Sequence, residues 1–167
     1  RNPNQMSHLP DGPWYYQQID LGFNYRMTDI QAALGTSQMN RIDNYINKRQ
    51  NIAAHYNREL SELPITTPHQ DVGNFSSCHL YVIRLQCEFL KKNHSQIFQS
   101  LRDEGIGVNL HYIPVHTQPY YTNLGFKVGD FPFSEAYYTR TVSLPVHPSL
   151  TSKNIELIIK TVNNILI

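Results

Sequence analysis

The strongest constraint on the fold is a polar loop, residues 22–27, that runs directly into the start of a helix. Thr28 can cap that helix with its hydroxyl, and Gln31 can return a hydrogen bond to the cap, as in a Thr-x-x-Gln capping box. Asn24 and Arg26 therefore lie just outside a helix N-terminus. Free N–H groups, the helix dipole and the Arg26 guanidinium favour a phosphate or carboxylate there. An ordinary capped loop with a solvated arginine is the alternative.

A long helical pattern follows this loop. Apolar residues recur at helical spacing from Thr28 to about Leu60, with no proline before Pro64 and no glycine after Gly35. Helices in globular proteins are mostly shorter, so we expect a bend or break near Asp43.

Short elements are expected after Pro64, and their order predicts an α/β fold with a small sheet and helices on one face. Residues 1–20, rich in Asn, Gln, Pro and Gly, cannot form a core alone. The expected elements are a strand over residues 79–85, a helix over 95–104, a strand over 108–112, a helix over 131–139, an extended segment over 142–144 and a terminal helix over 152–167.

Charge and composition exclude several functions. The 14 basic and 13 acidic residues give a net charge of +1, with no basic cluster for nucleic acid. No apolar run approaches the roughly 20 residues that cross a bilayer, and the first residues do not resemble a signal peptide. We therefore expect a cytoplasmic protein with no membrane partner. Cys78 and Cys87 lack metal-site spacing and are expected to be buried thiols.

Three segments resemble the C-terminal part of the DegT/DnrJ-type sugar aminotransferases, which are fold-type I enzymes that use pyridoxal phosphate on nucleotide-linked keto sugars. They are residues 22–35 (GFNYRMTDIQAALG), 111–121 (HYIPVHTQPYY) and 143–151 (SLPVHPSLT), in the family's order, with the strand of residues 77–83 between them. The resemblance covers nearly the whole chain. Residues 107–121 look most like members that aminate UDP-linked 4-keto sugars, as in the pseudaminic acid or aminoarabinose routes of polysaccharide biosynthesis.

This resemblance implies an architecture and an activity. Residues 41–167 would be the small C-terminal α/β domain, and residues 1–40 a remnant of the large cofactor domain with the start of the linking helix. The whole enzyme would move an amino group from glutamate to a UDP-linked 4-keto-6-deoxy sugar. The alternatives are a sugar dehydratase of the same family, or a non-catalytic sugar-nucleotide binding or dimerisation module.

No catalytic residue is assigned in this chain. Pyridoxal phosphate catalysis needs a Schiff-base lysine and an acid beside the pyridine nitrogen. Lys48 lies in the long helix, and Lys91, Lys92 and Lys127 lie in polar loops, so none has the context of a desolvated nucleophile. In the family both groups precede the 22–35 segment, and we therefore expect this chain to be inactive alone.

The binding residues come from the resemblance. Asn24 would reach the cofactor phosphate of the neighbouring subunit in a homodimer with shared active sites. Arg26 would anchor its loop or bind the anionic part of the substrate, unless it pairs with Asp29. His116 would bond a sugar hydroxyl or a phosphate oxygen, and a structural role is its alternative. By their residue type, Tyr112, Tyr120 and Tyr121 could stack on a uracil or sugar face, and aromatic packing is their alternative.

A metal site is not expected. His111 and His116 could suggest a ligand pair, but Pro114 stands between them. No cysteine or carboxylate lies nearby in the sequence to complete the ligand set.

Overall fold

The helical pattern predicted over residues 28–60 forms two helices, α1 (Asp29–Met39) and α2 (Ile42–Glu59). The predicted capping box is confirmed at the start of α1: the Thr28 hydroxyl accepts the Gln31 N–H, and the Gln31 side chain accepts the Thr28 N–H. The chain leaves the first helix at Asn40, whose N–H bonds back to the Thr36 carbonyl. The expected break therefore lies just before Asp43.

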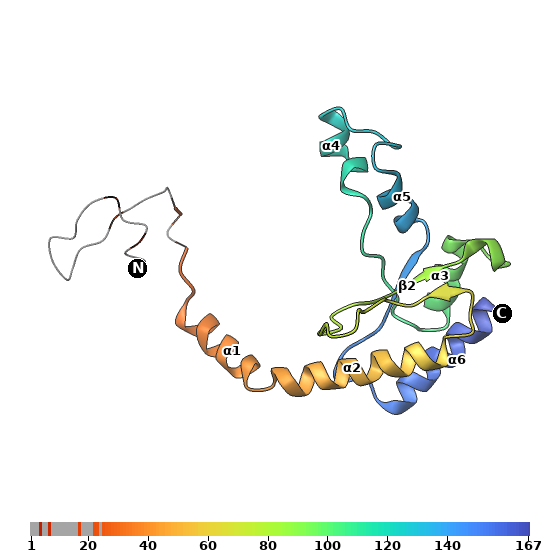
Figure 1. Cartoon of the computed structure of the whole chain (residues 1–167), viewed down its shortest axis with the longest axis horizontal. Coiled ribbons are helices and arrows are strands. Elements are labelled where there is room, and N and C mark those ends of the chain that lie inside the picture. The colour runs from red at the N-terminus through yellow and green to blue at the C-terminus, as the bar shows by residue number, and fades with distance from the viewer. Residues whose placement is uncertain (1–3, 5–6, 8–16, 18–21, 24) are drawn as a thin grey trace. The chain divides into compact units, whose positions relative to one another are not determined.

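The computed structural model describes residues 4, 7, 17, 22–23 and 25–167 (Figure 1). The chain divides into two units, Arg1–Asn40 and Arg41–Ile167, which are described separately. No residue of α1 is buried in the described structure. That the first unit belongs to a large cofactor domain stays a prediction.

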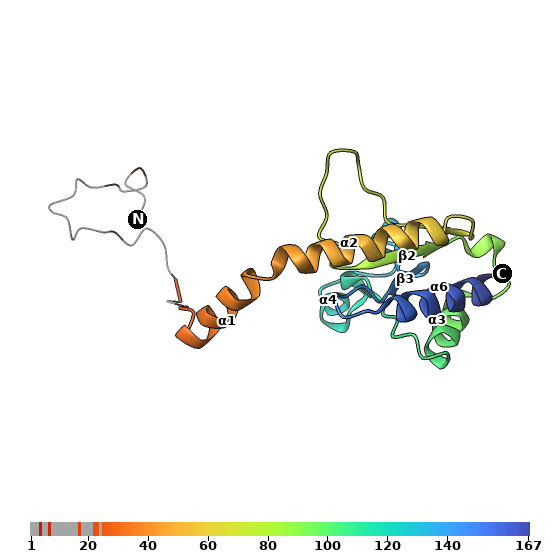
Figure 2. The same cartoon turned by 90° about the horizontal axis from the view of Figure 1, so that it is seen from below.

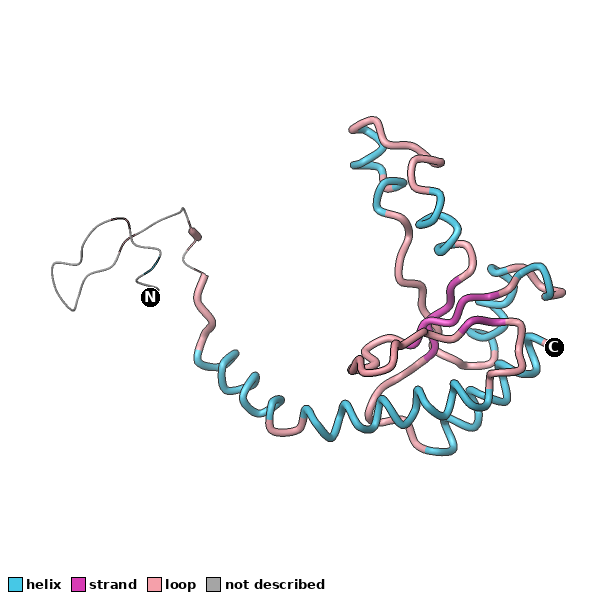
Figure 3. The backbone as a smooth tube through the Cα atoms, viewed as in Figure 1, coloured by secondary structure: helices cyan, strands magenta, loops and turns pink. Residues whose placement is uncertain are grey.

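The second unit is built on a three-stranded antiparallel sheet in the order β1-β2-β3 (Figure 3). The strands are β1 (Ile65–Thr66), β2 (Tyr81–Leu85) and β3 (Thr141–Leu144). Along β2, Tyr81, Ile83 and Leu85 are buried whereas Arg84 is exposed, so alternate side chains face opposite sides of the sheet. The predictions of strands at 79–85 and 142–144 are confirmed, but the two-residue β1 was not predicted.

Helices α2, α3 (His94–Asp103) and α6 (Ser152–Leu166) cover one face of this sheet (Figure 2). Asn93 and Thr151 cap α3 and α6 with complete capping boxes, and Gly105 ends the turn after α3 with a φ of 79°. The apolar faces of the helices pack on the inner strand residues to form the core, which includes Ile52, Tyr56, Ile83, Ile97, Leu101, Val142, Ile158 and Val162. The predicted α/β fold with helices on one face is confirmed.

The prediction of a strand over residues 108–112 is wrong, because only a single β-bridge forms there. Asn109 exchanges two backbone hydrogen bonds with Ser143, and the pairing stops there. The Leu110 N–H donates to the Asn109 side chain. Neighbouring N–H groups of a strand point to opposite sides, so the next position of the ladder is His111, which bonds to Ser143 through its ring and not through its backbone.

The chain then forms a lobe, residues 112–140, that projects from the sheet (Figure 1). It contains a 3-10 turn, η3 (Val115–Thr117), and the helices α4 (Pro119–Asn123) and α5 (Pro132–Tyr138). Both helices begin with proline, which suits a first helical position because its missing N–H is not needed there. The helix predicted over residues 131–139 is confirmed. A further 3-10 turn, η2 (Cys87–Phe89), follows β2.

Within the described residues, no helix combines the length and the apolar character needed to cross a membrane.

Candidate functional site

A buried histidine lies at the centre of the lobe. His116, in η3, is 6% exposed, and its Nε2 lies 2.8 Å from the Glu135 Oε1 on α5. The Phe131 ring packs beside the imidazole with centroids 4.9 Å apart. The sequence predicted His116 at the edge of a sugar site and outside the core of the small domain. It is buried inside the lobe, and its contact with substrate stays a prediction.

Glu135 joins two parts of the lobe. Its Oε1 accepts the Gly129 N–H at 2.7 Å as well as the bond from His116. The hydrogen bond from the Gly129 backbone, followed by that from the His116 side chain, holds the pKa of Glu135 below its ordinary value of 4.5. No local sequence pattern predicts this carboxylate, because it lies 19 residues from its histidine partner.

This arrangement predicts an acid-sensitive lobe. The pKa of Glu135 is lowered in the folded state, so as the pH falls this carboxylate is protonated in the unfolded chain before it is protonated in the folded one. The stability that the ionised carboxylate gives is complete above about pH 4.5 and is lost as the pH falls through the folded-state pKa. Thermal unfolding from pH 7 downward should therefore show a gap between wild type and Glu135→Gln that closes in acid. A gap that stays constant with pH would contradict this.

A hollow of ≈ 330 Å³ opens beside the imidazole. Three aromatic rings dominate its wall, and two of them, Tyr121 and Phe126, lie edge to face with centroids 6.3 Å apart. Its lining residues are Val115, His116, Tyr121, Phe126, Phe131 and Ser134. Apolar rings with a few polar groups are typical of sites that bind small molecules.

Tyr112 does not line this hollow. Tyr112 is 72% exposed, and its ring lies against that of His111, with centroids 4.6 Å apart. His111 is held in turn by the Ser143 hydroxyl, 2.7 Å from its Nδ1. Arg26 is exposed and belongs to the first unit, and Asn24 lies outside the described residues. The roles of these residues stay predictions.

The described residues contain no metal cluster: no three or more His, Cys, Asp or Glu side chains gather there. Lys48, Lys91, Lys92 and Lys127 are all exposed. The Nζ of Lys91 donates to the Ile167 carbonyl and that of Lys92 to the Ser100 hydroxyl. None of the four lines the hollow beside His116, so the described part of the chain offers no buried lysine to hold a cofactor aldehyde there.

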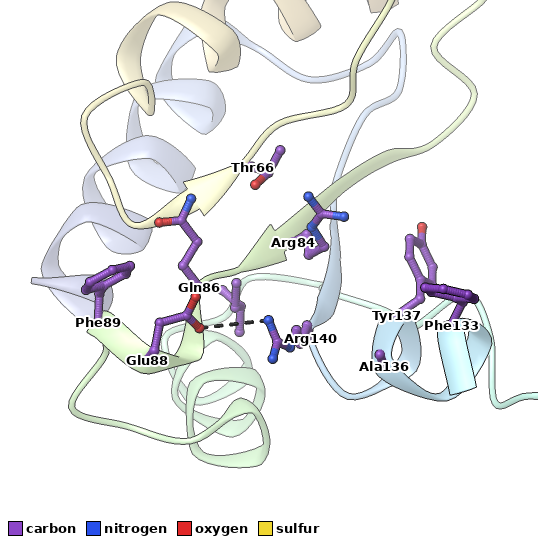
Figure 4. Close-up of a pocket in the computed structure, with 10 residues that line it drawn as sticks. Thr66, Arg84, Gln86, Glu88, Phe89, Phe133, Ala136, Tyr137 and Arg140 are labelled. Carbon is purple, nitrogen blue, oxygen red and sulfur yellow. Dashed lines mark ion pairs between the residues drawn. The ribbon is translucent and has the colours of Figure 1, made fainter. Parts of the chain in front are cut away.

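A second, larger hollow of ≈ 570 Å³ was not predicted. Arg84 enters it from the outer side of β2, and Phe133 and Tyr137 enter from α5 (Figure 4). Arg140 also lines it and lies 3.8 Å from the Glu88 carboxylate. Helix α5 borders both hollows, since Phe133 and Tyr137 line the larger one and Ser134 lines the one beside His116.

Comparison with known proteins gives a family for this arrangement. Residues 5–163 match the sequence profile of the DegT/DnrJ/EryC1/StrS aminotransferase family. The chain is 36% identical over 158 residues to the spore coat polysaccharide biosynthesis protein SpsC of Bacillus subtilis, covering 93% of this chain and 41% of that protein. It is 33% identical over 157 residues to a UDP-4-amino-4,6-dideoxy-N-acetyl-beta-L-altrosamine transaminase of Campylobacter jejuni, covering 92% and 40%.

The fold is also found among solved structures. The PLP form of the putative sugar aminotransferase Spr1654 from Streptococcus pneumoniae aligns with a TM-score of 0.78 and 29% identity, over 91% of this chain and 39% of that one. The chain thus spans about two fifths of the length of these relatives.

Proposed function

Because the chain belongs to the DegT/DnrJ/EryC1/StrS aminotransferase family, we propose that it is the C-terminal part of a pyridoxal-phosphate-dependent nucleotide-sugar aminotransferase. The whole enzyme moves an amino group from glutamate to a UDP-linked 4-keto-6-deoxy sugar. The observation that carries this proposal is the match of nearly the whole chain to family members, one of them named as a UDP-amino-sugar transaminase. Cytoplasmic location stays a prediction from the sequence.

The cofactor chemistry belongs to the part of the enzyme outside this chain in our proposal. Pyridoxal phosphate, when bound, supplies the electron sink that lets an amino group pass from glutamate to the keto carbon. The described lysines are exposed and do not fit the role of its covalent anchor. This chain contributes Asn24 toward the cofactor phosphate of a neighbouring subunit, and the lobe with His116 and Tyr112 toward the sugar nucleotide.

Exposed apolar side chains support a larger assembly. In α1, Ile30 is 83% exposed and Leu34 is 60% exposed, and in the lobe Tyr120 is 70% exposed and Phe133 is 91% exposed. Soluble proteins seldom leave large contiguous apolar areas in water unless these bind something. We propose that the large domain and a second subunit cover these surfaces, which gives a homodimer with shared active sites.

The activity is tested on the full-length protein with glutamate and a UDP-linked 4-keto-6-deoxy sugar. Formation of 2-oxoglutarate and of the UDP-amino sugar in equal amounts supports the proposal. A deoxygenated sugar without amine would instead identify the dehydratase alternative. Binding of the sugar nucleotide with neither product, and no cofactor absorbance in the visible range, would identify a binding or dimerisation module.

Asn24→Ala in the full-length enzyme should weaken cofactor retention. The amide is expected to donate a hydrogen bond to the cofactor phosphate across the dimer, and a bond to a charged acceptor is worth about 1.5–3 kcal/mol. Dialysis followed by spectroscopic titration should show roughly a ten- to hundredfold loss of affinity. Unchanged affinity in a dimer of normal stability would reject the role of Asn24.

His116→Ala should lower kcat/KM by about tenfold, because a hydrogen bond to substrate is worth about 0.5–1.5 kcal/mol and more when charged. The melting temperature should also fall, because His116 is 6% exposed and is hydrogen-bonded to Glu135, so the kinetics are measured at a temperature where the variant is folded. Steady-state kinetics and thermal unfolding of the same variant decide the matter. A large fall in melting temperature with near-normal turnover would assign His116 to packing alone.

A further inference from the structure

We propose that Glu135 is the positioning residue of His116: it holds the imidazole as the Nε2–H tautomer, so that Nδ1 accepts a hydrogen bond from a hydroxyl of the substrate. The part of this proposal that concerns substrate rests on the proposed function. The part that concerns the ring does not, because it follows from the geometry of the lobe.

The direction of the bond between the two side chains follows from their chemistry. An ionised carboxylate has no proton to give, so the 2.8 Å contact requires His116 Nε2 to carry the hydrogen and Glu135 to accept it. In a neutral imidazole the other nitrogen then has a free lone pair. Glu135 therefore fixes which ring nitrogen can accept.

The carboxylate is itself held in place. Gly129 donates its N–H to the same Oε1 at 2.7 Å, and its φ of 97° is one that a glycine adopts without strain. Both hydrogen bonds favour the ionised carboxylate, in agreement with the lowered pKa of Glu135. The group that orients the imidazole thus stays an acceptor at neutral pH.

The remaining nitrogen of the ring is available. Among the described residues, none forms a hydrogen bond to His116 Nδ1, and the residue lines the ≈ 330 Å³ hollow. Two other lining residues, Tyr121 and Ser134, carry a side-chain hydroxyl. Nδ1 as an acceptor in this hollow selects a ligand O–H or N–H. An unprotonated phosphate oxygen has no hydrogen to donate, and it would be repelled by the Nδ1 lone pair and by the negative charge of Glu135. This favours the sugar hydroxyl over the phosphate oxygen.

Nitrogen NMR of the full-length holoenzyme with 15N-labelled histidine tests the ring directly. At about pH 8, where imidazoles are ordinarily neutral, the His116 signals, identified by their loss in His116→Gln, should show a protonated Nε2 and an unprotonated Nδ1. Glu135→Ala should abolish this preference. Glu156→Ala, the same change at an exposed position on α6, should leave the His116 signals unchanged. A protonated Nδ1 in the wild type, or an unchanged tautomer in Glu135→Ala, would overturn the proposal.

Kinetics with glutamate and the UDP-linked 4-keto-6-deoxy sugar test the consequence. Glu135→Ala and His116→Ala should each lower kcat/KM by about tenfold, and the double variant should be no worse than the more impaired single one, because both remove one contact. Glu135→Gln keeps an oxygen acceptor for both N–H groups and should recover much of the activity. Losses that multiply in the double variant would show that Glu135 does not act through His116.

The two experiments separate the possible failures. If His116→Ala leaves kcat/KM unchanged while the NMR result holds, the substrate contact is wrong and the positioning of the ring stands. If Glu135→Ala does not fold, the wild-type spectrum and the Glu135→Gln kinetics still decide. Wild-type Nδ1 protonation then overturns the proposal, and so does a Glu135→Gln enzyme as impaired as His116→Ala.

Discussion

The 167-residue chain by itself should show no transamination and no stoichiometric pyridoxyl adduct after borohydride reduction. A lysine attacks an aldehyde only in its uncharged form, which burial favours and contact with water does not. Lys48, Lys91, Lys92 and Lys127 are exposed, and no described lysine lines the hollow beside His116. The expected loss of activity relative to the full-length enzyme is complete.

The measurement is mass spectrometry after incubation with pyridoxal phosphate and borohydride, together with an assay for 2-oxoglutarate. The full-length protein in the same buffer is the positive control. The heat-unfolded chain gives the level of nonspecific labelling. One pyridoxyl group per chain on any of its six lysines, above that level, would show that this chain carries its own anchor.

Ile83→Ala should destabilise the second unit by about 2–5 kcal/mol. Ile83 is the central residue of β2, is 0% exposed and lies in the core between the sheet and its helices. Removing three carbon atoms there loses transfer free energy and leaves a cavity that rigid strand neighbours fill poorly. Few single substitutions in this chain should cost more.

Urea denaturation followed by far-UV circular dichroism measures this effect. Val82→Ala is the matched control, because the adjacent residue faces the other side of the same strand and is only half-buried. It should cost under about 1 kcal/mol. Equal losses for the two variants would mean that the inner face of β2 is not the core that the structure shows.

The sequence predicted the elements whose signals are local. An apolar stripe marks α6, and a glycine marks the end of α3, so both helices were predicted close to their true bounds. The strand at 108–112 was wrong because Val108 and its neighbours have strand character, but the backbone pairing with β3 ends at Asn109, and His111 bonds to Ser143 through its ring instead. β1 has two residues, too few to show the alternation of apolar and polar side chains that predicts a strand.

The site depends on contacts that no local pattern carries. The histidine in the 111–121 segment could be identified, but its partner Glu135 comes from a helix beyond a glycine turn. The hollow of Figure 4 is assembled from β1, β2 and α5, with Thr66, Arg84 and Tyr137 far apart in the sequence. Such groups become neighbours only through the fold, and periodicity does not record them.

The brevity of the strands at the sheet's borders has a consequence for aggregation. β1, at one edge, has two residues, and the other edge, along β3, is interrupted after the single bridge to Asn109. An incoming chain adds to a sheet by pairing with a row of free N–H and C=O groups, and short or interrupted edges offer few of them. The described sheet is therefore a poor template for intermolecular strand addition, even with its outer face still uncovered.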